Sequence, residues 1–202
     1  MTTPRHLLII ALDVASSRPV EQGELSLALA GAELIDLLDA RAAALEGDRI
    51  VPGPETVTDD RLLDEAASAL VRQEPYESAE EWLWRRGKGL SSAYQAALEA
   101  DGQVARERHR WIPVRTGRTA LVDSPARRRA DDRWTSGERV LAGLAAAVGI
   151  LDAPDEGFEG PTDDDAVVTV LAAVHDAVME LEAVRQRRSI ENAAFDNIWR
   201  GQ

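Results

Sequence analysis

Few residues of this 202-residue chain have the types and spacing that catalysis requires. The three histidines, His6, His109 and His175, are far apart, and none belongs to the His-Glu-x-x-His pattern of zinc enzymes. The chain has no cysteine, which excludes thiolate nucleophiles, thiolate metal ligands and disulfides. It also lacks a Gly-x-Ser-x-Gly elbow, a Walker A loop and a dinucleotide-binding glycine pattern. We therefore expect a protein without catalytic residues, cofactor or bound metal.

Two clusters of carboxylates are the remaining candidates for chemistry. Asp163-Asp164-Asp165 could attract a hard cation, and Asp59-Asp60 with Asp64-Glu65 could supply a pair for acid–base catalysis. Both clusters stand where a helix is expected to begin, and acids in a first turn interact favourably with the helix dipole. Solvated helix starts are the simpler interpretation of both clusters.

The cationic residues gather in the middle of an acidic chain. The net charge is −13, yet residues 85–139 hold 13 Arg or Lys and only 7 acids. One interpretation is a solvated face whose arginines pair with acids from either flank. The other is a patch that binds an anion, such as a phosphorylated headgroup, an anionic membrane or a nucleic acid.

The elements that must position these residues are mostly helices. Residues 7–12 form a short apolar run, either a strand or the start of a helix. Apolar residues then recur at helical spacing in residues 24–45, 58–70, 78–98, 140–149 and 162–181. Residues 103–122, with a turn at Arg115-Thr116-Gly117-Arg118, are typical of a β-hairpin. We predict a mainly α-helical single domain with one β-hairpin over residues 5–200.

Three details sharpen this helical assignment. Ser78 and Glu81 have the spacing of a capping box at a helix start. Gly31 lies inside an apolar helix, which indicates a close approach of a second helix. His175 borders the apolar face of the last helix, so we expect it to be packed and hydrogen-bonded.

Location and origin follow from composition. No apolar stretch reaches the roughly 18 residues of a membrane span, so we expect a cytoplasmic protein. Lysine occurs once, at Lys88, while arginine and alanine are abundant, which suggests a GC-rich bacterial gene.

Several segments, in order, resemble the Golgi phosphoprotein 3 family. The similar segments are Leu7–Asp13, the small-residue helix Leu29–Leu37, Thr58–Ala66, Trp82 after an acidic helix start, Gly102 before a basic hairpin, and the helix around His175. The most specific of them is Thr58–Ala66, which resembles a Thr-Gly-Asp-x-Leu-Leu-Asp-Glu-Ala pattern with Asp59 in place of the glycine.

The resemblance implies a mostly helical domain that binds phosphatidylinositol 4-phosphate at membranes and gathers the cytoplasmic tails of Golgi enzymes. In the eukaryotic members the headgroup pocket uses a Trp, an Arg in the small-residue helix, and two Arg three residues apart. The matching positions here are Glu21, Ala30, Lys88 and Ser91. Only Lys88 is a cation, with Arg85 and Arg86 close by.

The leading hypothesis is a non-enzymatic peripheral-membrane module that binds anionic or phosphoinositide lipids. Its predicted headgroup ligands are Arg85, Arg86, Lys88 and Trp82. A basic surface patch is predicted at Arg106, Arg108, Arg110 and Arg115. The alternatives are a protein–protein adaptor of the same fold, which could include a homo-oligomer, and a winged-helix-like nucleic-acid binder, which the net negative charge disfavours.

Overall fold

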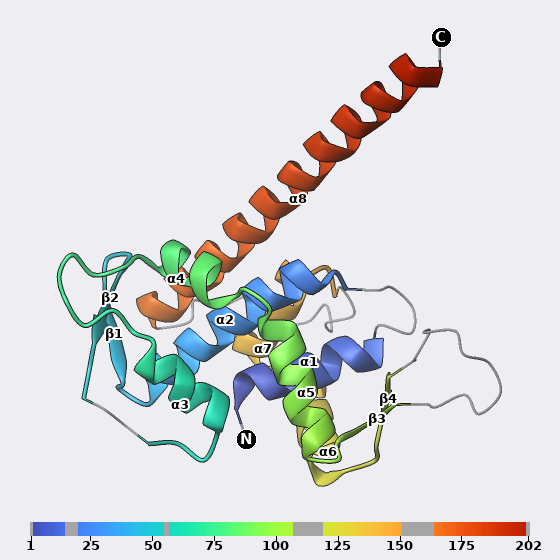
Figure 1. Ribbon diagram of the computed structural model, residues 1–202. Coiled ribbons are helices and arrows are strands. Elements are labelled where there is room, and N and C mark those ends of the chain that lie inside the picture. The colour runs from blue at the N-terminus through green and yellow to red at the C-terminus, as the bar shows by residue number, and fades with distance from the viewer. Residues whose placement is uncertain (1, 15–19, 55–56, 107–118, 151–163, 201–202) are drawn as a thin grey trace.

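The computed structural model places a ring of helices around one central helix, α2 (Figure 1). It describes residues 2–14, 20–54, 57–106, 119–150 and 164–200. The predicted mainly α-helical domain is confirmed. The helices are α1 (Thr3–Val14), α2 (Gln22–Asp39), α3 (Arg61–Ser68), α4 (Ala79–Arg86), α5 (Leu90–Ala100), α6 (Pro125–Thr135), α7 (Arg139–Ala147) and α8 (Asp165–Arg200). The strands are β1 (Ala43–Glu46), β2 (Arg49–Pro52), β3 (Val104–Arg106) and β4 (Thr119–Leu121).

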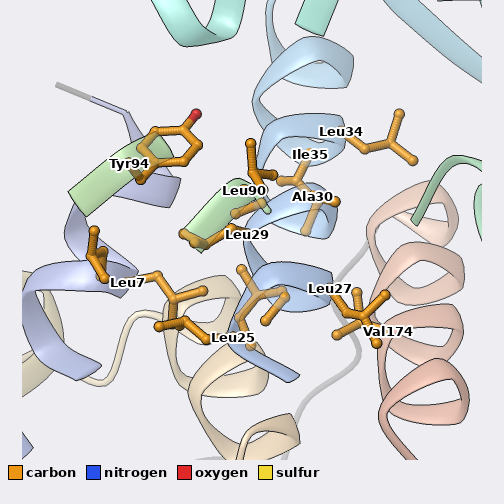
Figure 2. Close-up of a cluster of buried hydrophobic side chains, with 14 of the residues drawn as sticks. Leu7, Leu25, Leu27, Leu29, Ala30, Leu34, Ile35, Leu90, Tyr94 and Val174 are labelled. Atoms are coloured by element: carbon orange, nitrogen blue, oxygen red, sulfur yellow. The ribbon is translucent and has the colours of Figure 1, made fainter. Parts of the chain in front are cut away.

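Helix α2 forms the centre of the hydrophobic core. Every residue from Leu25 to Ile35 is buried, because α1, α4, α5, α7 and α8 all pack against this helix. A helix that is apolar on all sides is stable in water only when other elements cover all of its faces. Figure 2 shows leucines of α2 between Leu7 of α1, Tyr94 of α5 and Val174 of α8.

The close approach predicted at Gly31 occurs between α2 and α8. A Cβ atom built on Gly31 would lie 2.3 Å from Cγ2 of Val174. No real Cβ tolerates that distance, so the glycine sets the spacing of the two helices. On α8 the buried stripe consists of Val167, Val170, Val174, Ala177 and Val178.

Local capping signals define the starts of α3 and α4. Ser78 accepts a hydrogen bond from the Glu81 amide, and the Glu81 carboxylate accepts one from the Ser78 amide, which confirms the capping box. Asp60 caps α3 by accepting a hydrogen bond from the amide of Leu62. These bonds satisfy amide groups that a helix start otherwise leaves without partners.

The elements between these helices differ in part from the expectations. The helix predicted to run to residue 45 ends at Asp39, because Arg41 adopts a left-handed conformation (φ 55°) and β1 pairs with β2 as an antiparallel hairpin. The hairpin predicted over 103–122 is seen at its base, where Val104 opposes Leu121. Helix α6 was not predicted, although Ser124 caps it and Pro125 occupies its first turn.

The last helix, α8, is 36 residues long, and its contacts with the other elements extend from its start to Arg185, which pairs with Glu24 of α2. Its C-terminal half extends away from the body (Figure 1), where residues 186–192 are exposed. Among the described residues, no helix combines the length and the apolar character needed to cross a bilayer.

Candidate functional site

The predicted headgroup ligands do not share one surface, and Arg86 faces inward. Its guanidinium donates two hydrogen bonds of 2.8 Å to the carboxylate of Glu33, and a third of 3.0 Å to the carbonyl of Leu62. The Glu33 side chain is fully buried (0% exposed) and also accepts a hydrogen bond from the Tyr94 hydroxyl at 3.0 Å. Arg86 therefore neutralises a buried charge in the centre of the fold.

The protonation of this buried cluster follows from its surroundings. Burial raises the pKa of the Glu33 carboxyl, and the hydrogen bonds from Arg86 and Tyr94 oppose that rise. Burial and the neighbouring Glu33 charge raise the pKa of Tyr94, so the phenol keeps its proton and acts as a donor. Glu33 was not singled out from the sequence, although a carboxylate between apolar residues on both sides, in Gly31–Ile35, was a usable signal.

Arg85 and Trp82, the two other predicted ligands on α4, also make their contacts with residues of the fold. The guanidinium of Arg85 donates to the carboxylate of Glu77 and to the carbonyl of Ala69, and it lies 5.3 Å from the ring centre of Trp82. Trp82 is fully buried, and its indole Nε1 donates to the carbonyl of Ala30 at 3.0 Å. This aromatic side chain anchors α4 to α2, while Arg85 stays half exposed at the rim.

Lys88, the remaining predicted ligand, lies at an open cleft of about 320 Å³ between the start of α2 and the α4–α5 turn. Lys88 is exposed and forms no ion pair within the part of the chain that the structure describes. The polar part of the lining comprises Gln22, Ser26, Ser91 and Ser92, and the apolar part includes Leu27, Trp84 and Leu181. We call this hollow the lysine cleft.

Two helices begin at the lysine cleft without a capping side chain on the residue that precedes the first turn. The residue before the first turn of α2 is Glu21, whose side chain accepts no hydrogen bond from that turn, and the residue before α5 is Gly89, which has no side chain. Ser26 joins the two helix starts, since its hydroxyl accepts from the Ser91 amide at 3.1 Å and donates to the Ser91 hydroxyl at 2.9 Å. Amides at uncapped helix starts attract anions.

The structure describes only one of the four residues of the predicted basic patch. Arg106 lies in β3, whereas Arg108, Arg110 and Arg115 lie outside the described residues. The patch therefore stays a prediction. On α6, the nearby Arg127 and Arg128 pair with Asp13 and Asp123.

The structure describes two of the histidines, His6 and His175, whereas His109 lies outside the described residues. His175 is exposed, so its predicted packing was wrong: it lies one position beyond the buried stripe of α8, next to Val174. His6 is buried, and its Nδ1 lies 2.7 Å from a guanidinium nitrogen of Arg133. Burial and the charge of Arg133 lower the pKa of His6 to about 4. Among the described residues, no group of histidines and acids could hold a metal ion.

A second hollow lies between the start of α4 and the first half of α8. This groove of about 440 Å³ is bordered by four acids, Asp48, Glu80, Asp176 and Glu180, and its apolar lining includes Val168 and alanines of α8. No cation lines the groove among the described residues. We call it the acidic groove.

Comparison with known proteins agrees with the sequence resemblance. The family model of Golgi phosphoprotein 3 (GPP34) matches residues 4–190, which is nearly the whole chain. No curated protein matches the sequence.

Proposed function

The chain belongs to the Golgi phosphoprotein 3 family, and from that premise we propose that it is a non-enzymatic peripheral-membrane module that binds an anionic lipid headgroup in the lysine cleft. We further propose that it resides in the cytoplasm and reaches the membrane through this contact. The first headgroup to test is phosphatidylinositol 4-phosphate, because the family resemblance points to it.

The single observation that carries the proposal is the combination of Lys88 with two uncapped helix starts. Lys88 supplies a mobile positive charge, and fixed donors come from the first-turn amides of α2 and from the Ser92 amide of α5, since the Leu90 and Ser91 amides already bond Gly87 and Ser26. The hydroxyl of Ser92 adds a further donor at the same edge. These groups together complement a phosphate, while Trp84 offers an apolar wall to the rest of a headgroup.

Arg85 and Arg86 have a different role in this proposal. Arg86 is held by a fully buried carboxylate, and Arg85 by Glu77, so neither lines the lysine cleft. We expect them to keep α4 in place, so that the α4–α5 turn presents Lys88.

The test is co-sedimentation with vesicles of neutral phosphatidylcholine, of the same lipid with phosphatidylglycerol, and with phosphatidylinositol 4-phosphate, at low and high salt. Salt-sensitive binding to the anionic vesicles is expected. Lys88→Gln should weaken it about fivefold, since a cation near an anionic bilayer contributes about 1 kcal/mol. The matched control is Arg61→Gln, which removes an exposed charge of α3 outside the cleft.

Ser92→Glu separates binding from folding. Ser92 is the third residue of α5, where a glutamate interacts favourably with the helix dipole. The variant should therefore keep its melting temperature and lose vesicle binding, because the new carboxylate repels the headgroup. Unchanged binding in both Lys88→Gln and Ser92→Glu would contradict the proposed cleft. Preference for the phosphoinositide would identify the headgroup.

A protein–protein adaptor is the second candidate, and the acidic groove favours it. Its four carboxylates around an apolar floor complement a cationic, partly apolar segment of another protein. Absence of binding to every vesicle would favour this candidate over lipid binding.

A further inference from the structure

A third hollow, lined mostly by polar side chains, lies at the end of α5 that is opposite to Lys88. It has a volume of about 400 Å³ and is formed where the start of α1, the segment before α3, the end of α5 and helix α6 meet. Helix α5 has 11 residues, so its two ends are about 16 Å apart. The new cleft is therefore separate from the lysine cleft, and its occupant does not depend on the proposed lipid binding.

The inner part of this cleft is held by a charge network. Arg5 donates to Asp60 and to Asp101, each at 2.5 Å, and the Arg5 side chain is only 15% exposed. Asp60 also accepts from the hydroxyl of Thr2 at 3.0 Å and caps α3 through the Leu62 amide. Burial alone would raise the pKa of Asp60, but the hydrogen bond and charge of Arg5 outweigh it and lower that pKa. The network joins three segments and keeps the inner wall ionised.

The rim of the cleft carries charges of both signs that remain available. Arg129 of α6 and Asp59 are exposed, and neither forms an ion pair, with the other or with any residue the structure describes. Asp101 is half exposed, so part of its carboxylate faces solvent beside Arg5. The carboxamide oxygen of Gln103 accepts from Ser124, which fixes that side chain at the rim.

We propose that this cleft binds a small zwitterion, in which a primary ammonium group lies a few bonds from a phosphate or carboxylate. The guanidinium of Arg129, with the amide donors of Gln103, takes the oxyanion. Asp59 and Asp101 take the ammonium group. The volume lies within the range of small-molecule sites.

The mixed lining explains why a zwitterion fits better than either of its halves. A simple anion in the cleft meets three carboxylates, those of Asp59, Asp60 and Asp101, and a simple cation meets the guanidiniums of Arg5 and Arg129. A ligand with both charges pairs with the guanidinium of Arg129 and with the carboxylates of Asp59 and Asp101 at the same time. Neither sign of charge in the cleft is then left without a partner. Charge complementarity of this kind gives selectivity between ligands.

The experiment is an isothermal titration of the full chain at low ionic strength with O-phosphoethanolamine, with inorganic phosphate and with ethanolamine. We expect the zwitterion to bind about tenfold more tightly than either simple ion. Arg129→Gln and Asp59→Asn should each weaken the zwitterion about fivefold, the range of an exposed charge pair. The matched controls are Arg128→Gln and Asp131→Asn, which remove neighbouring charges of α6 outside the cleft. Both should leave the affinity for O-phosphoethanolamine unchanged.

The two simple ions make the assignment of roles testable. Asp59→Asn should not weaken the binding of inorganic phosphate, because it removes a carboxylate that repels the anion. Arg129→Gln should not weaken the binding of ethanolamine, because it removes a guanidinium that repels the cation. The proposal is overturned if O-phosphoethanolamine binds no better than its halves, or if both rim variants bind it like the unaltered chain.

A vesicle arm distinguishes a free solute from a lipid headgroup of the same chemistry. Phosphatidylcholine vesicles with and without phosphatidylethanolamine, neither of which carries a net charge, are compared at the low ionic strength of the titration. Vesicle binding that requires phosphatidylethanolamine and is weakened in Asp59→Asn assigns the headgroup as the ligand, whereas titration binding without vesicle binding assigns a free solute. Lys88→Gln should leave the titration unchanged, so failure of the lipid proposal and failure of this one are told apart.

Discussion

Replacement of Arg86 by methionine tests whether this arginine stabilises the fold rather than contacting a headgroup. The change leaves the Glu33 carboxylate fully buried, with the Tyr94 hydroxyl as its remaining donor among the described side chains. Removal of one partner of a buried ion pair costs about 3–5 kcal/mol. A domain of this kind is stable by about 5–15 kcal/mol, so the variant should remain measurable.

The assay is urea unfolding, followed through tryptophan fluorescence, since Trp82 is fully buried beside α2. The double variant Glu33→Met with Arg86→Met should recover at least about 2 kcal/mol relative to Arg86→Met, because no unpaired charge remains in the core. As a control, Arg61→Met breaks the exposed pair with Glu65 and should cost less than about 0.5 kcal/mol.

The reasoning is refuted if Arg86→Met costs less than about 1 kcal/mol, or if the double variant is no more stable than the single one. If Arg86→Met does not fold, Glu33→Gln provides the same information. It keeps an acceptor for Arg86 and should cost less than Arg86→Met. Vesicle binding, compared at equal folded fraction, should be the same in Arg86→Met as in the unaltered chain.

Two further predictions concern packing and acid stability. Gly31→Ala should destabilise the fold by about 1–3 kcal/mol through the clash with Val174, and Val174→Ala in the same chain should recover part of that loss in a urea titration. The pKa of His6 is lowered to about 4 in the fold, so the unfolded chain binds its proton first as the pH falls. Stability should therefore decline between pH 6.5 and 4, by up to about 3 kcal/mol, and His6→Gln should remove most of that decline. Equal pH profiles of the two proteins would contradict this account.

The sequence predicted best those elements that short-range interactions define. The capping box of α4 needs only residues three positions apart, and the amphipathic stripe of α8 needs only its own periodicity. The close approach at Gly31 was also predicted, because a glycine inside an apolar helix lowers helix stability and is favourable there only when a second helix packs closely against it. Family membership was likewise recognisable, since it depends on the order of several such segments.

The misassigned elements were those that distant residues stabilise. Residues 43–46 have helical composition, yet they pair with residues 49–52, and only the whole chain makes that pairing favourable. The α6 segment was missed because its apolar face is small, with Ala126 and Ala130 as its buried residues. His175 was predicted to pack against the core, but the buried stripe of α8 runs through the preceding residue, Val174.

The sequence by itself determined that this is a cysteine-free, acidic, mainly helical domain of the Golgi phosphoprotein 3 family with cations concentrated in its middle. Tertiary structure alone decided which of those cations pair with carboxylates of the fold and which line a cleft. Arg85 and Arg86 are adjacent and chemically identical, and Lys88 follows two residues later, yet only Lys88 lines the lysine cleft. The physical reason is that a buried carboxylate such as Glu33 must be paired, and the partner it takes depends on how α2 and α4 pack.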